Sequence, residues 1–117
     1  MGYVAVMTAD ELNYKIYKQL ESNPQQSQRE LAKTLGISLG KANYCIKALV
    51  GKGLVKARNF RNNQNKLAYM YLLTPKGIEV KVSLTSRFLK YKMDEFEVLK
   101  KEIAELRRET EKNSKVE

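Results

Sequence analysis

The sequence predicts a mainly α-helical chain with one small β-hairpin, an α+β fold in which a single domain is followed by one long C-terminal helix. Three observations support this prediction. First, a helix-capping pattern precedes each of three short segments in which apolar residues recur at helical spacing. Second, two segments rich in strand-forming residues flank a polar turn. Third, no proline or glycine interrupts most of the last third of the chain. We expect a domain over residues 8–74 and a helix over residues 75–112.

The first helix is expected over residues 9–22. Residues 8–11, Thr-Ala-Asp-Glu, form a capping box in which the threonine hydroxyl accepts from the glutamate amide. Apolar side chains then recur every fourth residue from Leu12 to Leu20, which is the spacing of one helix face. The helix should end before Pro24, because the residue preceding a proline is pushed out of the helical region.

Two further helices follow at short spacing. A second capping box at residues 27–30 predicts a helix over residues 28–35, which ends at Gly36. Ser38 can cap a third helix over residues 39–50. The pair therefore has the length, caps and tight turn of a helix-turn-helix.

The apolar residues of this pair support the same interpretation. Ala32 is small enough for the point where the two helices cross, and Gly36 follows four residues later at the turn. Cys45 falls on the inner stripe, so we interpret it as a core residue rather than a reactive thiol. The contacts that hold the pair together are expected from Leu31, Leu35, Ile37, Ala42, Cys45, Ile46 and Leu49.

A β-hairpin is expected next, with strands at residues 54–60 and 66–73 and a polar turn at residues 61–65. A helix-turn-helix followed by such a hairpin is a winged helix-turn-helix. Tyr69 and Tyr71 are expected as core and strand-surface residues rather than as a platform for stacked bases, because a helix should cover one face of the hairpin.

The charge is concentrated in this part of the chain. Residues 27–66 carry nine lysines or arginines against one acid, Glu30, whereas the formal net charge of all 117 residues is +9. A basic block within a folded domain is typical of a protein that neutralises nucleic-acid phosphates. The alternative is a solubilising surface, which usually mixes both signs.

Helix periodicity places one polar face of the third helix outward. Lysines there can donate to guanine or phosphate oxygens, and Asn43 can pair bidentately with adenine, although an ordinary solvated face is the alternative. We expect the recognition helix at residues 39–50 and the wing at residues 58–66. The predicted contacts to double-stranded DNA are Ser27, Gln28, Arg29, Ser38, Gly40, Lys41, Asn43, Tyr44, Lys47, Arg58, Arg61, Asn63 and Lys66.

The last helix carries a heptad seam that starts at Ile78 and predicts a homodimeric coiled coil. The first seam residues, Ile78 and Val82, could instead pack on their own domain. Antiparallel pairing is favoured because it separates two DNA-binding heads, and parallel pairing, which would place two Lys92 side chains face to face, stays open. The predicted dimerisation residues are Leu89, Lys92, Phe96, Leu99, Ile103 and Leu106.

Several function classes find no support in the sequence. There is no histidine, no glycine-rich phosphate loop and one cysteine, so we expect no enzyme, no metal site, no cofactor and no intrachain disulfide. The apolar run within residues 1–7 is too short for a signal peptide or a membrane span. We therefore expect a cytoplasmic protein without a membrane partner.

Three runs resemble the winged-helix regulators of the MarR family: residues 28–38 (QRELAKTLGIS), 48–55 (ALVGKGLV) and 73–77 (LTPKG). Residues 38–45 (SLGKANYC) further resemble the subgroup associated with exopolysaccharide. This resemblance implies a bacterial transcriptional regulator near polysaccharide gene clusters. The sequence departs from the family in two places. Asn65-Lys66 stands where the family's wing has Asp-Arg. A single long helix replaces the family's several dimerisation helices, so the sequence does not support a small-molecule effector pocket.

The main hypothesis is therefore a sequence-specific, dimeric regulator of transcription that binds double-stranded DNA. One alternative is a winged-helix protein-interaction module, although such a surface would not need so much positive charge. Another is a protein that binds nucleic acid without sequence preference.

Overall fold

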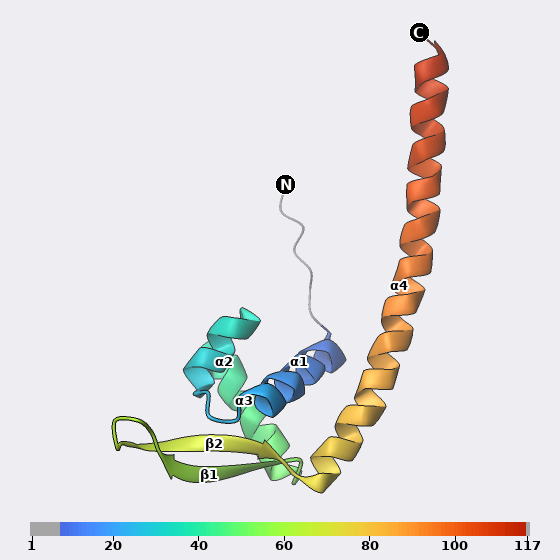
Figure 1. Cartoon of the computed structure of the whole chain (residues 1–117). Helices are drawn as coiled ribbons and strands as arrows, with labels where there is room; N and C mark the ends of the chain where they lie inside the picture. Colours follow the sequence, from blue (N-terminus) through green and yellow to red (C-terminus); the bar gives the residue numbers. More distant parts are fainter. Residues whose placement is uncertain (1–7, 117) are drawn as a thin grey trace. The chain divides into compact units, whose positions relative to one another are not determined.

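A computed structural model describes residues 8–116, and residues 1–7, on which the expectation about leader and anchor segments rests, lie outside this part. The described chain confirms the predicted fold class (Figure 1). Its helices and strands are α1 (Ala9–Ser22), α2 (Gln28–Leu35), α3 (Leu39–Gly51), β1 (Val55–Arg61), β2 (Leu67–Leu73) and α4 (Pro75–Val116). The contacts divide the chain after Thr85 into two units, which are described separately below.

The helices of the first unit begin where serine or threonine caps them. The side-chain oxygens of Thr8, Ser27 and Ser38 each accept a hydrogen bond from the backbone amide three residues later, at 3.0 to 3.1 Å. At the other end of α2, Gly36 adopts a left-handed conformation with φ 68°, which a residue without a β-carbon tolerates best. The predicted turn between α2 and α3 is thus confirmed.

The core of the first unit lies between α1, α2, α3, the hairpin and the start of α4. Ala32 and Ala42 are almost completely buried, which explains the small residues where the helices pack. Burial also raises the pKa of the Tyr17 phenol. The other buried apolar side chains are Leu12, Ile16, Tyr17, Leu20, Leu31, Cys45, Ile46, Leu49, Leu54, Val55, Tyr71 and Leu84.

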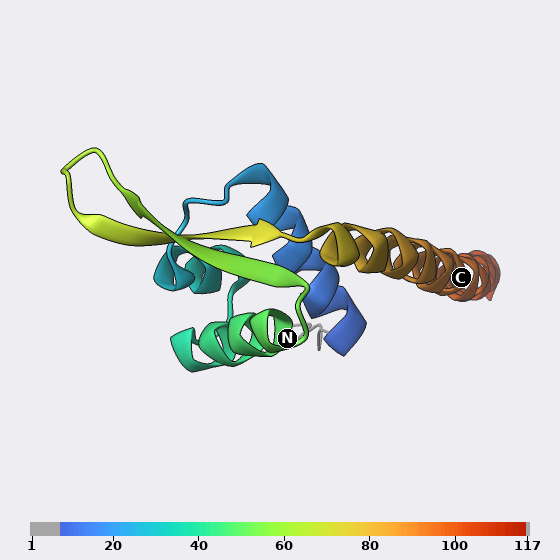
Figure 2. The same ribbon diagram turned by 90° about the horizontal axis from the view of Figure 1, so that it is seen from below.

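The hairpin is antiparallel, with Val55 opposite Leu73 at its base and Arg61 opposite Leu67 near its tip. Its base lies beneath the helices, while its tip extends past them (Figures 1 and 2). The amide of Tyr71 donates to the carbonyl of Pro24 at 2.9 Å, which ties β2 to the segment before α2. This packing leaves the tip of the wing open to a partner.

The wing tip is a tight turn rather than an irregular loop. The amide of Asn65 donates to the carbonyl of Asn62 at 2.9 Å, and Asn65 has a φ of 58°. The side-chain oxygen of Asn62 accepts from the amides of Gln64 and Lys66 at 2.9 and 3.0 Å. Asparagine suits both places, because its short amide bonds nearby backbone and tolerates the left-handed region.

The start of α4 is built into the first unit. The Thr74 side-chain oxygen accepts from the Gly77 amide at 3.0 Å, and its hydroxyl donates to the carbonyl of Gly53 at 2.6 Å. A β-carbon at position 77 would lie 2.0 Å from the carbonyl oxygen of Leu54, so only glycine allows this approach. The same unit includes the following turns of α4, as far as Thr85.

The face of α4 that packs on the core is not the heptad seam, so the alternative in which Ile78 and Val82 pack on their own domain is wrong. Ile78 and Val82 do not pack on the domain, because their side chains are 50 and 63 % exposed. Val80 and Leu84 pack there instead. The first turns of α4 thus use a face beside the heptad seam, which leaves the seam uncovered from its beginning.

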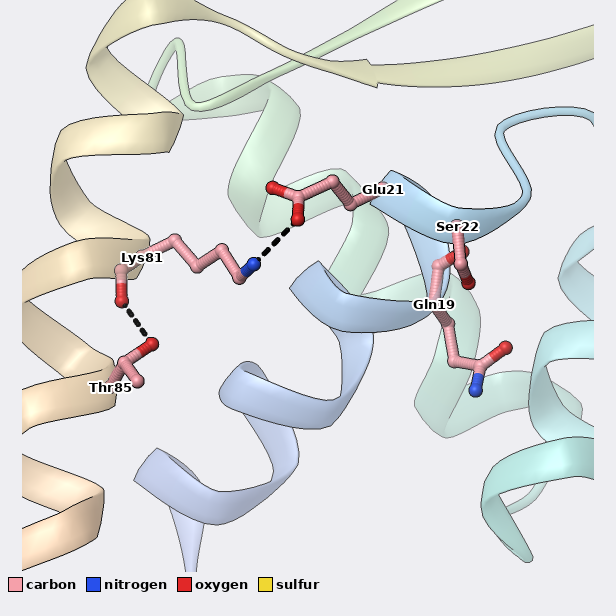
Figure 3. A network of polar contacts seen from close by, with 5 residues as sticks. All are labelled: Gln19, Glu21, Ser22, Lys81 and Thr85. Atoms are coloured by element: carbon pink, nitrogen blue, oxygen red, sulfur yellow. Dashed lines mark hydrogen bonds and ion pairs between the residues drawn. The ribbon is translucent and has the colours of Figure 1, made fainter.

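An ion pair reinforces this contact between α1 and α4. The Nζ of Lys81 donates to the carboxylate of Glu21 at 2.6 Å, and the hydroxyl of Thr85 donates to the carbonyl of Lys81 at 2.7 Å (Figure 3). The helix α4 continues through Asn113 and Ser114 to Val116, beyond the expected end at residue 112. Within residues 8–116, no helix is both long enough and apolar enough to cross a membrane.

Candidate nucleic-acid interface

The helix α3 presents the outer face that its periodicity predicts. Ala42, Cys45, Ile46 and Leu49 are buried. The four outer residues Gly40, Lys41, Tyr44 and Lys47 are exposed, and Asn43 is half-buried at the edge of this face. The predicted reading residues of α3 therefore lie on one accessible surface.

The first two turns of α3 carry Gly40, Lys41 and Tyr44 on their exposed face. A β-carbon at Gly40 would meet nothing nearer than the Ser38 Oγ at 4.0 Å, so packing within the chain does not require a glycine there. The Nζ of Lys41 lies 5.8 Å from the centre of the Tyr44 ring. This cation–π contact holds an ammonium group and an aromatic ring side by side on the outer face.

The start of α2 is partly used for internal contacts. The side-chain amide of Gln28 donates to the hydroxyl of Tyr71 at 3.0 Å, a contact across 43 residues that the sequence did not predict. The hydroxyl of Ser27 caps α2 and donates to the Glu30 carboxylate at 3.3 Å. Arg29 is exposed. Ser27 and Gln28 are thus held in defined positions at the helix N-terminus, where backbone amides favour anions.

A groove of about 700 Å³ separates the start of α2 from the wing. It brings together part of the predicted contact set, whereas the predicted residues of α3 do not line it. Aromatic side chains of the hairpin, Phe60 and Tyr69, form part of its wall. The predicted residues that line the groove are Ser27, Gln28, Arg61 and Asn63.

The two arginines of the wing are placed differently. Arg61 pairs with Leu67 and Arg58 with Met70, and because side chains alternate along a strand the two arginines lie on opposite faces of the hairpin. The Nη1 of Arg61 donates to the carbonyl of Asn65 at 3.1 Å, which braces the turn. Arg58, Asn63 and Lys66 are exposed.

Within residues 8–116, no ion pair neutralises the positive charge of this region. The lysines that form ion pairs there are Lys15, Lys81, Lys92 and Lys100, all of them outside the basic block of residues 27–66. The nine basic residues of that block therefore keep a field that attracts a polyanion.

The second unit presents an apolar seam on its helix. The predicted dimerisation residues other than Lys92 are 41 to 61 % exposed in the single chain, although all are large and apolar. Lys92 forms an ion pair with Glu95 at 3.1 Å on the same helix. An exposed apolar stripe of this length is typical of an interaction surface.

Comparisons with known proteins agree with this geometry. Residues 10–56 match the family described as winged helix-turn-helix DNA-binding. Among solved structures, the adhesin competence repressor AdcR of Streptococcus pyogenes has a similar fold, with a TM-score of 0.60, 20 % identity, and coverage of 81 % of this chain and 67 % of that one. No curated protein sequence is significantly similar to this chain.

Two further structures show the same fold. A MarR transcriptional regulator of Methanosarcina mazei has a TM-score of 0.59 and 21 % identity, and the PcaV transcriptional regulator of Streptomyces coelicolor, solved with its natural ligand, has 0.57 and 22 %. Both cover 74 % of this chain, which itself spans only 60 % of the length of either. The chain thus contains a winged helix-turn-helix domain with the fold of MarR-family regulators.

Proposed function

We propose that this protein is a sequence-specific transcriptional regulator that binds double-stranded DNA as a homodimer. The observation that carries the proposal is the exposed face of α3, which has two lysines and no acid and belongs to a basic block without internal ion pairs. A helix of this kind in a winged helix-turn-helix fits the DNA major groove.

The proposed contacts divide into readers and anchors. On α3, Asn43 pairs with adenine, and Lys41 and Lys47 donate to guanine or to phosphates. Around them, Arg29 and the capped start of α2 hold a phosphate, while Arg58 and Arg61 reach the minor groove or the backbone beside it. Readers set the sequence preference, and anchors set the orientation.

The homodimer is proposed from the second unit. The apolar seam residues of α4 are not buried within one chain, and a second copy would bury them because it offers the same seam. Two copies then present two recognition helices, which match a DNA site of two related half-sites. No small-molecule effector is part of the proposal.

Selection of bound fragments from genomic DNA tests the DNA-binding part directly. We expect recovery of a common motif, first of all near genes for exopolysaccharide synthesis, and a preference for that motif that survives when the salt concentration is raised. Fragments without a common motif would instead indicate binding without sequence preference, and no retention of DNA would favour the protein-interaction module.

A matched pair of variants makes this experiment sharper. Lys41→Ala with Lys47→Ala removes two charges from the outer face of α3, whereas Lys76→Ala with Lys90→Ala removes two exposed charges of α4. Both variants have the same net charge. We expect the first to lose the motif and the second to retain it, and equal behaviour of the two would contradict the assignment of α3 as the reading helix.

A further inference from the structure

We propose that the two α4 helices of the homodimer pair in parallel and in register, as a two-stranded coiled coil over residues 89–106. This inference rests on the proposed homodimer and adds its orientation and register. It replaces the antiparallel pairing that the sequence analysis favoured, because it also takes into account the charges that flank the seam.

The seam divides into the two core positions of a heptad. Leu89, Phe96 and Ile103 occupy the first position, a, and Lys92, Leu99 and Leu106 occupy the fourth, d. The five apolar members are exposed in the single chain, in contrast to the buried Leu84 just before them. These five side chains therefore stay about half exposed within the described residues, and a parallel in-register pair would place each of them opposite its own copy.

The flanking charges are segregated by sign. The positions immediately before each a residue, which are the g positions, carry the acids Glu95, Glu102 and Glu109. The positions immediately after the last two d residues, which are e positions, carry the bases Lys100 and Arg107. One flank of the seam is thus acidic and the other is basic over the same two heptads.

This segregation distinguishes the two orientations. In a parallel in-register pair, each g residue lies beside the e residue five positions later in the other helix, so Glu95 faces Lys100 of the second copy and Glu102 faces Arg107 of the second copy. In an antiparallel pair centred on the midpoint of the seam, g faces g and e faces e, which places Glu95 against Glu102 of the second copy, whereas Lys100 and Arg107 face the uncharged Met93 and Ser86. Opposite charges therefore meet only in the parallel arrangement.

The surface of α4 also holds the socket that such packing needs. A shallow hollow on the seam is lined by Ile103, Leu106, Arg107 and Thr110, with Glu111 at its edge. The first four are the a, d, e and next a positions, the set that receives a d-position knob in a coiled coil. In register, that knob is Leu106 of the second copy.

The lysine inside the seam is compatible with this pairing. Two Lys92 ammonium groups would repel each other if both pointed into the interface. In the structure, the Lys92 Nζ lies 3.1 Å from the carboxylate of Glu95, so the ammonium group is drawn toward the acidic flank. A long side chain can lay its methylene groups along the seam and keep its charge at the edge.

Cross-linking at Asn113, the d position that follows Leu106, tests the orientation in the full-length protein. Asn113→Cys should form a disulfide-linked dimer under mild oxidation, because parallel register places the two thiols face to face. If the seams paired antiparallel about their midpoint, the two positions would lie about 45 Å apart, at 1.5 Å per residue. Arg108→Cys, on the outer face of the same helix, is the matched control and should not cross-link.

A charge swap tests the same point without a new thiol. Arg107→Glu should weaken the dimer at least several-fold in sedimentation equilibrium, because it places two glutamates opposite each other in each symmetric pair. Adding Glu102→Lys should restore the affinity, since the pair is then reversed. Antiparallel pairing about the midpoint predicts that Arg107→Glu has little effect, because residue 107 then faces the uncharged Ser86 of the second copy.

The outcomes separate this inference from the proposed function. A dimer that neither cross-links at position 113 nor responds to Arg107→Glu overturns the parallel register and leaves the homodimer in place. A protein that sediments as a monomer overturns both the register and the homodimer, even if it still selects a DNA motif. A cross-linked dimer that selects no DNA supports the register and contradicts the DNA-binding role.

Discussion

The two units of this chain use the same kinds of apolar residue in opposite ways. Up to Thr85, leucines and isoleucines such as Leu20 and Ile46 are buried within one chain. From Ser86 to Ser114, leucines and isoleucines such as Leu99 and Ile103 remain about half exposed, although they too lie on one helix face. The first unit buries its apolar surface by folding, whereas the second has to bury it by association with another chain.

This difference predicts a separation of roles. Changes on α3 should alter which DNA is bound without altering the number of chains, and changes on the seam should do the reverse. Both kinds of change should lower the affinity for a DNA site of two half-sites. Dimerisation contributes to this affinity because, once one recognition helix is bound, the effective concentration of the other at the second half-site is raised.

The largest effect is expected from Leu99→Asp, which places a charge in the seam. The dimer should dissociate at micromolar concentration, and affinity for the DNA site should fall by at least about 100-fold as the joint binding of two heads is lost. Sedimentation and a binding titration measure both quantities. Val98→Asp is the control, since Val98 is similarly exposed but lies off the seam, and a dimeric Leu99→Asp protein would show that the seam is not the interface.

Next in size is Gly77→Ala, which affects the first unit alone. The added β-carbon would lie 2.0 Å from the Leu54 carbonyl oxygen, so the start of α4 has to move. We expect the free energy of unfolding, measured with urea, to fall by about 3 kcal/mol. Gly51→Ala, which has open space around the added carbon, should change it by less than about 1 kcal/mol. Equal values would contradict the close approach of α4 to Leu54.

A smaller effect is expected on the reading face. Asn43→Ala and Lys41→Ala should each cost about 1–3 kcal/mol of binding free energy and relax the preference at one base position. Arg61→Ala should weaken binding to all sequences more evenly, because it contacts the backbone or minor groove. Titrations against the selected motif and single-base variants distinguish these cases, and an Asn43→Ala protein with unchanged affinity and preference would show that α3 lies differently on DNA.

The last change, at Lys92, is expected to stabilise the dimer, because a leucine there would complete the apolar seam. Lys92→Leu should raise the melting temperature of the dimer by a few degrees, because burial of a leucine stabilises by about 1.5–3 kcal/mol. It should also admit higher oligomers, since a polar core residue limits the number of helices. A lower melting temperature would mean that the ion pair with Glu95 stabilises the interface more than apolar packing does.

Much of the fold follows from short-range signals. The caps at Ser27 and Ser38 and the left-handed Gly36 act through hydrogen bonds within four residues, so the sequence predicts α2 without the rest of the chain. The burial of Cys45 likewise follows from helix periodicity. The outer face of α3 was predictable for the same reason.

Other features depend on contacts between distant residues. The hydrogen bond from Gln28 to Tyr71 joins segments that meet only in the folded domain. The seam pattern could not show whether Ile78 faces the domain, because a heptad repeat and a core-facing stripe have nearly the same period. Gly77 was the available signal, since a glycine within a helix often marks a close approach.

The most direct test of the whole account is footprinting of the purified protein on a selected DNA site at saturation. We predict two protected half-sites of related, inverted sequence, with their centres about 34–36 Å apart or at a multiple of that spacing. Each half-site reports one α3, and their pairing reports the α4 seam. Saturated protection of a single, unpaired half-site would contradict the account.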